Sequence, residues 1–444
     1  MQKVSTLLLL LTTLFSCKPR TEVYSNVEIV VGRLQGIQVL INDSVVGYTD
    51  HLGTYTVSEL TSLDSLRLFD PDFTFTREKF WTSSPQFSYR FLPHKRQSAK
   101  DSAAISFLLS LQKANGLLPS IEGGDLVSTY DQALAVIAFC KTGHLHEAEN
   151  ILDYFESQRV SELESGLGGF YQFRSTSGVP TGNRWMGDNA WLLIAVSTYH
   201  ATVSQGIRKY YELEGSLHRW LASLEDPYGD GLYGGYLPNG DTIHKITEGN
   251  IDAFVAFGNN NDLNSSILRH LEADKWDPVD GNLMAWPTNP SYKYALDCNT
   301  WAYCAFPEYP ESARDNLDKF EISTTSTITG ELINGYCFDE DQDVLWFEGT
   351  GQVAVMHWVA GDHQAAKEVL EELEKGWITT ANGEQGLPYA ANHGTGYGAT
   401  DLWAAASTDP CISSTAWYLM ASYRYNPLGF RRFFPTEAKP IFWD

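Results

Sequence analysis

The sequence predicts a mainly helical fold of twelve helices, arranged as an inner and an outer ring of six each and preceded by a small β-sandwich. Three observations lead to this prediction. Hydrophobic residues alternate with a period of two up to about residue 93 and recur with helical spacing from Asp101 onward. The helical part contains capped apolar runs that alternate in kind. The connections between these runs alternate between short and long.

The first seventeen residues predict a lipoprotein signal peptide. Lys3 precedes an apolar run from Leu7 to Phe15, which is too short to span a membrane as an ordinary helix. The run ends in LFSC, which resembles the bacterial lipobox and implies cleavage before Cys17 and attachment of lipid to its thiol. We therefore expect a protein anchored through Cys17 in the bacterial cell envelope, on the outer membrane at its periplasmic or surface face.

Residues 24–93 predict the small β-sandwich. Short runs of β-branched residues, such as VEIVVG, are separated by turn-forming clusters at Asn42 to Ser44 and at Asp50 to Gly53. The stretch GIQVLINDSVVGYTDHLGTYTV resembles the carboxypeptidase regulatory-like (transthyretin-like) sandwich, which implies an accessory module without catalytic residues. The polar segment Pro93 to Lys100 is predicted to be a linker.

The helical candidates that follow alternate between two kinds. The odd-numbered ones are amphipathic and charged, as helices with one solvated face must be, whereas the even-numbered ones are apolar almost all round, as buried helices are. We infer an outer ring and an inner ring. In chain order the candidates are DSAAISFLLSLQKANG, STYDQALAVIAFCKTG, HLHEAENILDYFESQ, GDNAWLLIAVSTYHA, GIRKYYELEGSLHRWLASLE, EGNIDAFVAFGN, DLNSSILRHLEADKW, LDCNTWAYCAF, ESARDNLDKF, FEGTGQVAVMHWVAG, HQAAKEVLEELEKG and CISSTAWYLMASYRYNP.

The loops indicate where function is placed. Connections from an inner to an outer helix are short, such as KTG, whereas connections from an outer to an inner helix are long and rich in Gly, Pro and aromatic residues. The long loops are therefore expected to gather at one end, where the inner helices begin. Polar or acidic residues stand at these six helix starts, which we call the mouths: Asp131, Asp188, Glu248 with Asp252, Asp297, Glu348, and Ser413 with Ser414.

This alternation, together with the mouths GDNAW, TEGNID and WFEGTGQ, resembles the (α/α)6 toroid of the six-hairpin glycosidases. The resemblance covers residues 101–430 as architecture and leaves a C-terminal tail at 431–444. It implies a catalytic domain whose site lies in the cavity at the N-termini of the inner helices. It does not place the chain in one glycosidase family, so no family's catalytic residues are carried over. We expect a glycoside hydrolase that acts on a poly- or oligosaccharide.

The catalytic candidates are Asp188, Glu348 and Glu248. Neighbouring helices pack about 10 Å apart, so opposite inner helices lie roughly 20 Å apart, and two inward side chains leave about 8 Å between Asp188 and Glu348. This separation favours an inverting hydrolase, with Glu348 as general acid and Asp188 or Glu248 as base. Helix capping is the alternative role for each of these acids. Glu248 and Glu348 each precede a Gly, which lets the backbone approach a ligand closely.

Further residues near the mouths are candidates for substrate binding. Aromatic side chains in the long loops can stack on sugars. Arg184, His244 and Lys245 can hold a carboxylate, which keeps open a polysaccharide lyase on the same toroid; a non-catalytic glycan-binding lipoprotein is the other alternative. Asp297 is expected to be structural. The binding candidates are Asp131, Asn189, Asn250, Asp252, Arg184, Trp185, His244, Tyr236, Trp286, Trp346, His393 and Tyr397.

Composition argues against several other functions. A net charge of −24 disfavours binding to nucleic acid. The five cysteines after Cys17 lack CxxC spacing and look like buried small hydrophobic residues rather than disulfides or metal ligands. The acidic run from Asp339 to Asp343 lacks the Gly and Glu of an EF-hand loop and predicts a solvated loop. We expect no metal and no cofactor, and the oligomeric state stays open.

Overall fold

The structure is a computed structural model. The chain divides into two compact units between Arg96 and Gln97, inside the predicted linker. No helix of the described residues is long and apolar enough to cross a membrane. Cys17 and the rest of the predicted signal peptide lie outside the described residues. The structure describes residues 22–32, 34–50, 53–76, 79–81, 88–203, 209–258, 261–285, 293–306, 309–393, 408–429 and 443.

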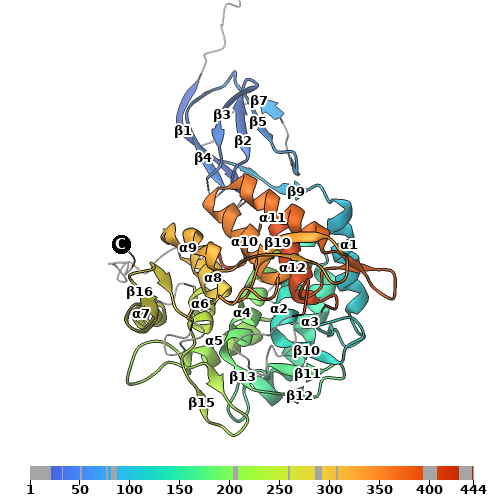
Figure 1. Ribbon diagram of the computed structural model, residues 1–444. Coiled ribbons are helices and arrows are strands. Elements are labelled where there is room, and N and C mark those ends of the chain that lie inside the picture. Colours follow the sequence, from blue (N-terminus) through green and yellow to red (C-terminus); the bar gives the residue numbers. More distant parts are fainter. Residues whose placement is uncertain are drawn as a thin grey trace, which may run out of the picture. The chain divides into compact units, whose positions relative to one another are not determined.

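The first unit is made of β-strands (Figure 1). One sheet has the order β4 (Thr54–Thr61), β1 (Val23–Val31), β8 (Ser88–Phe91), with β1 antiparallel to β4 and parallel to β8. A second sheet has the order β3 (Ser44–Tyr48), β2 (Gln38–Ile41), β5 (Ser65–Phe69), β7 (Lys79–Trp81). Both sheets contribute to one apolar core, which includes Val27, Ile29, Val39 and Leu68.

Local sequence explains the turns of this unit. Asn42 and Asp43 have φ angles of 51° and 62°, so they form the left-handed turn that joins β2 to β3, as the sequence predicted. The linker prediction was wrong at its start, because β9 (Pro93–Lys95) pairs with β6 (Phe73–Phe75). A Pro at the first position of an edge strand costs no ladder hydrogen bond, so a polar segment can still extend a sheet.

The second unit contains twelve α-helices in its described residues, and they match the predicted candidates in order. The even-numbered helices are α2 (Thr129–Thr142), α4 (Met186–Thr202), α6 (Thr247–Phe257), α8 (Leu296–Ala305), α10 (Phe347–Ala360) and α12 (Ile412–Ser422). The odd-numbered helices are α1 (Ala99–Leu111), α3 (Leu145–Gln158), α5 (Tyr211–Ala222), α7 (Asn261–His270), α9 (Ser312–Asp315) and α11 (His363–Lys375).

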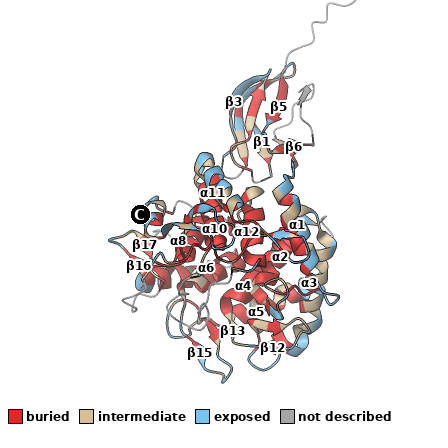
Figure 2. Ribbon diagram, turned by 45° about the vertical axis from the view of Figure 1, so that its right-hand side comes forward, coloured by how far each residue is buried: buried red, intermediate tan, exposed pale blue. Residues whose placement is uncertain are grey.

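The even-numbered helices form the inner layer. Each packs against the next in chain order, and α12 packs against α2, so the contacts close a ring. Each odd-numbered helix packs outside, against a neighbouring inner helix. Figure 2 shows the inner helices buried on all sides and outer helices such as α3 and α11 with one solvated face. The five cysteines of this unit are free and buried, as predicted.

Helix ends follow ordinary capping chemistry. Ser98 and Asp101 form a capping box at the start of α1. Gly143 and Gly361 adopt the left-handed conformation that ends α2 and α10. These stops produce the short connections from inner to outer helices.

The long loops carry short strand pairs and end at the inner helices. The first three inner helices are preceded by β10 (Leu126–Ser128), β11 (Phe173–Ser175), β12 (Pro180–Thr181), β13 (Arg184–Trp185), β14 (Gly235–Tyr236) and β15 (Thr242–Ile243). The last three are preceded by β16 (Trp276–Asp277), β17 (Asn282–Leu283), β18 (Glu321–Thr325), β19 (Leu332–Tyr336), β20 (Ile378–Thr379) and β21 (Gln385–Gly386).

One repeated hydrogen bond fixes these loops to the mouths. In five of the inner helices, a first-turn side chain accepts the backbone N–H of an apolar or aromatic residue in the preceding loop. The pairs, acceptor first, are Gln132 with Leu118, Asn189 with Phe170, Asn250 with Leu232, Thr350 with Tyr336, and Thr415 with Leu387. We call these five side chains the loop clamps.

Candidate active site

Carboxyl groups gather where the inner helices begin, each contributed by the first or second turn of its helix. Charge interactions connect Glu248 with Asp297, Asp252, Asp188 and Glu348. The same kind of interaction connects Glu348 with Asp131. The structure therefore brings together side chains that are far apart in the sequence. We call these six residues the carboxyl cluster: Asp131, Asp188, Glu248, Asp252, Asp297 and Glu348.

Tyr130 connects two members of the cluster that come from different helices. Its hydroxyl donates a hydrogen bond of 2.6 Å to Glu348 Oε1 and accepts one of 3.1 Å from the indole N–H of Trp417. Its backbone N–H donates to Asp188 Oδ1 at 3.3 Å. Ser413 also donates to Glu348, which lowers the pKa of that carboxyl. Asp188 and Glu348 thus accept hydrogen bonds that stabilise their charged forms.

Burial raises the pKa values throughout the cluster, because it penalises the charged form. It raises the pKa of Asp131, Asp188 and Asp297 to about 7 and the pKa of Glu348 to about 8. Burial and the neighbouring charge of Asp297 raise the pKa of Glu248 and of Asp252 well above the usual carboxyl range. Part of the cluster therefore carries protons at neutral pH.

Glu248 differs from the other members in its contact with solvent. It is half-buried, whereas the other five carboxyl side chains are buried. Its carboxyl group has no hydrogen-bond partner among the residues that the structure describes. A half-buried carboxyl group with a raised pKa and no competing hydrogen bond is suited to donate a proton to a ligand.

Asp252 lies one helical turn below Glu248. It is 0% exposed, and neither of its carboxylate oxygens has a hydrogen-bond partner in the described part of the chain. The indole N–H of Trp191 faces Asp252 and lowers its pKa, but it does not reach hydrogen-bonding geometry. A buried, unpaired carboxylate is costly, so these surroundings favour the neutral form of Asp252 and raise its pKa.

An aromatic group from alternate inner helices packs beside the cluster. Trp191 of α4 contacts Trp301 of α8 and Trp417 of α12, with ring centroids 5.3 and 5.9 Å apart. Tyr130 packs edge-on against Trp191 at 5.3 Å. The three tryptophans are almost completely buried. This packing excludes water from one side of the carboxyl groups and explains why their pKa values rise.

The predicted binding residues have different surroundings. Asn189 and Asn250 are loop clamps, and their side-chain amides also donate to backbone carbonyls, so these two amides are committed to holding the loops. Arg184 donates to the backbone carbonyls of Glu162, Gly168 and Gly169 and stacks on Tyr171, with its guanidinium carbon 4.1 Å from the ring centroid.

The aromatic and histidine candidates divide by exposure. Trp185 and Tyr236 are half-buried on the paired strands β13 and β14, while Trp346 is buried against Phe338. His244 and His393 are exposed. Trp286 and Tyr397 lie outside the described residues.

Sequence reasoning missed two tyrosines of this site. Tyr130 stands one position before Asp131, and its role depends on contacts with α10 and α12 that no local pattern encodes. Tyr389 is half-buried, and burial together with the charge of Glu348 raises its pKa well above the usual value. Its place in the long loop before α12 was the available signal.

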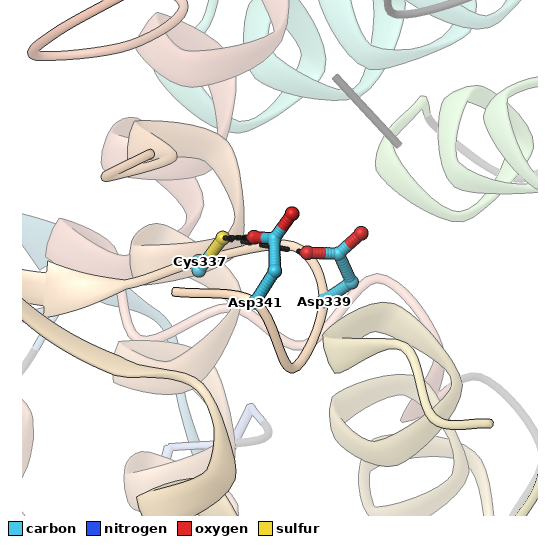
Figure 3. A group of neighbouring side chains, drawn as sticks. All are labelled: Cys337, Asp339 and Asp341. Atoms are coloured by element: carbon cyan, nitrogen blue, oxygen red, sulfur yellow. Dashed lines mark hydrogen bonds between the residues drawn. The ribbon is translucent and has the colours of Figure 1, made fainter. Parts of the chain in front are cut away.

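A separate acidic group lies in the loop between β19 and α10 (Figure 3). The Cys337 thiol approaches Asp339 Oδ1 at 3.7 Å and Asp341 Oδ1 at 3.6 Å. Asp341 is exposed, as a solvated loop predicts, but Asp339 is buried and its pKa rises to about 7 because of burial and the adjacent Asp341. The spacing of these three ligand atoms would suit a metal ion.

The fold is shared with solved sugar-active enzymes. A glycosidase with one Glu replaced by Ala matches with a TM-score of 0.55 and 14% identity, over 75% of this chain and 96% of that chain. A D-mannose isomerase matches with a TM-score of 0.52 and 12% identity, over 74% and 98% of the two chains.

The cellobiose 2-epimerase of Bacillus thermoamylovorans matches with a TM-score of 0.51 and 10% identity, over 73% of this chain and 98% of that chain. No protein-family model and no curated protein matches the sequence. The structural likeness confirms the predicted resemblance to (α/α)6 toroid enzymes at the level of the fold.

Proposed function

We propose that the helical unit is a glycoside hydrolase that cleaves a poly- or oligosaccharide by carboxyl acid and base catalysis. The observation that carries this proposal is the carboxyl cluster, in which Glu248, with a raised pKa and no competing hydrogen bond in the described structure, stands near carboxyl groups that accept hydrogen bonds. Glycoside hydrolysis needs this pairing of one acid with one base. The fold shared with a glycosidase supports it as an analogy.

Glu248 is the proposed general acid, in place of Glu348, the acid expected from the sequence. A general acid must contact the glycosidic oxygen, and Glu248 is the half-buried member of the cluster. Glu348 is buried and already accepts a hydrogen bond from Tyr130. We assign Glu348 to positioning Tyr130.

Asp188 is the proposed base. Its pKa of about 7 leaves a large ionised fraction at neutral pH, and the backbone N–H of Tyr130 stabilises that form. A base that activates water on the face opposite the acid gives inversion at the anomeric carbon. Nuclear magnetic resonance of the first-formed anomer tests this point, and retention would contradict it.

The two roles are separable with aryl glycosides whose leaving groups differ in acidity. Glu248→Gln should lose about 10²–10⁴-fold in kcat on a poor leaving group and much less on nitrophenol, which leaves without protonation. Asp188→Asn should lose activity on both substrates, because water activation is still needed. Glu371→Gln, on the exposed face of α11, is the control and should behave as the unmodified protein. Full activity of both site variants would contradict the assignment.

The lyase alternative has less support from the site. A lyase must neutralise a uronate carboxylate with a cation, and the Arg184 guanidinium is bound to backbone carbonyls. New reducing ends without ultraviolet absorbance indicate hydrolysis, and absorbing products indicate a lyase. Binding of glycans without any cleavage would favour the non-catalytic alternative.

We also propose that Cys17 is lipidated and anchors the protein in the envelope, which mass spectrometry of the mature N-terminus from the native host tests. The lipobox-like LFSC supports this part of the proposal. A Cys17→Ala variant should be released from the membrane fraction. Membrane retention of that variant would contradict it.

A further inference from the structure

We propose that the carboxyl cluster selects its substrate by charge, taking uncharged sugar units and excluding those that carry carboxylate or sulfate groups. This inference rests on the proposed function, because it names the substrate class of the same site. It concerns the net charge of the groups that surround the ligand, which is independent of which carboxyl group acts as acid.

No cation among the described residues balances the cluster. The charge interactions that shift Asp188, Glu248, Asp252 and Glu348 come from other acids. Lys245 pairs with Asp226 at 2.7 Å, and the Lys275 ammonium donates to the backbone carbonyl of Lys245. Burial and the charge of Lys275 lower the pKa of His244, which keeps that ring neutral at neutral pH.

The sequence adds no cation from the undescribed parts of the loops before α8 and α12. Residues 286–292 read WPTNPSY and residues 394–407 read GTGYGATDLWAAAS, without Lys, Arg or His. Of the described residues of these two loops, Lys293 pairs with Asp277 and His393 is exposed.

The unpaired acids set the direction of the effect. Glu248 and Asp252 have no hydrogen-bond partner in the described part of the chain, and Asp252 is completely buried. An anionic group placed beside them would face the ionised fraction of Asp188 and would find no cation to pair with among the described residues. Like charges in a desolvated site repel strongly, so the expected discrimination is about 100-fold or more.

The test compares one polysaccharide in a neutral form and in an oxidised, anionic form. Each neutral polysaccharide that the protein acts on is oxidised in graded steps at C6, which converts hydroxymethyl groups into carboxylates without changing the linkage. Release of reducing ends should fall by about 100-fold or more at full oxidation. Affinity electrophoresis through gels that contain either polymer gives the same comparison by binding, whether or not the bond is cleaved.

The outcomes separate this inference from the proposed function. Equal hydrolysis or equal retardation by both polymers overturns the charge inference and leaves hydrolysis standing. Retardation by the neutral polymer without cleavage overturns the proposed function and supports charge selection. Ultraviolet-absorbing products from the oxidised polymer overturn both, and so does the absence of both cleavage and retardation with either polymer.

Two variants test whether the carboxyl cluster causes the discrimination between the two polymers. Asp297→Asn removes one acid that faces Glu248, so it should reduce the discrimination between the two polymers by about 10-fold. Glu371→Gln removes one exposed charge on α11 and should leave the discrimination unchanged. An equal change in both variants would show that overall protein charge, and not the cluster, sets the preference.

Discussion

Two pairs of carboxyl groups at the mouths of the inner helices have opposite surroundings. Asp188 and Glu348 accept hydrogen bonds from the backbone and the hydroxyl of Tyr130. Glu248 and Asp252 have no hydrogen-bond partner in the described part of the chain and are shifted chiefly by burial and by Asp297. Donors favour the charged forms of the first pair, whereas no donor in the described part of the chain does so for the second.

This difference shows how one fold divides acid from base with a single residue type. Burial raises the pKa of all four groups, so burial alone cannot distinguish them. The donors on one pair and their absence from the other create the distinction, because donors favour the charged form. The following changes should enlarge or remove the difference.

The largest expected effect is a loss of stability as pH rises. Carboxyl groups with pKa values near 7 in the folded chain and about 4 in the unfolded chain bind more protons when folded between these values. Stability is therefore highest near or below pH 4 for these groups and falls as pH rises to 8. Urea unfolding at pH 5 and pH 8 should differ by several kcal/mol. A constant free energy of unfolding would contradict the protonated cluster.

The helices that carry the two pairs also carry loop clamps. Removing a clamp should have a smaller effect on stability than the change in pH. Asn189→Ala on α4 and Asn250→Ala on α6 each leave a buried backbone N–H without its acceptor. Each variant should lose about 2–3 kcal/mol of unfolding free energy. Similar losses would show that the two pairs differ in their donors and not in the rigidity of their helices. A large loss in only one variant would contradict that view, and thermal unfolding measures it.

The sequence predicted the helices well and the site only in part. The twelve helices were visible because inner runs such as VAVMHWV are apolar all round, and this pattern is local. The acids could also be predicted from local sequence, because each stands at a helix start. Tyr130 was not, because its hydroxyl meets Glu348 from a position 218 residues away. Asn189 and Asn250 looked available, yet their partners lie in loops whose folding sequence periodicity does not describe.

Tyr130→Phe should remove one hydrogen bond from the pair formed by Asp188 and Glu348. Its effect on stability should lie between those of the loop-clamp variants and of Asp252→Asn. It removes the donor to Glu348 and the acceptor of the Trp417 N–H but keeps the backbone N–H that contacts Asp188. We expect a loss of about 1–2 kcal/mol in stability. If the hydroxyl also positions the site, kcat should fall about 10-fold while KM changes little, and the pH profile of kcat should shift. An unchanged profile with only lower stability would restrict Tyr130 to a structural role.

Asp252→Asn should produce the smallest change in stability, and this change should be a gain where the other variants show a loss. The substitution removes an acid whose ionisation at high pH raises the pKa of Glu248, so that pKa falls and the basic limb of the activity profile moves to lower pH. Because Asp252 has no hydrogen bond to lose in the described structure, we expect a gain of about 1 kcal/mol in stability at pH 8.

Asp101→Asn is the matched control for that gain. Asp101 is also completely buried, but it accepts hydrogen bonds from the Ser98 backbone N–H at 2.8 Å and the Ser422 hydroxyl at 2.6 Å. Removing its charge weakens both bonds, so this variant should lose stability. If both variants lost stability by similar amounts, Asp252 would have to be a paired carboxylate as well. Opposite signs of the two stability changes would show what decides whether a buried carboxylate stabilises the fold. The deciding factor would be its hydrogen-bond donors more than its burial.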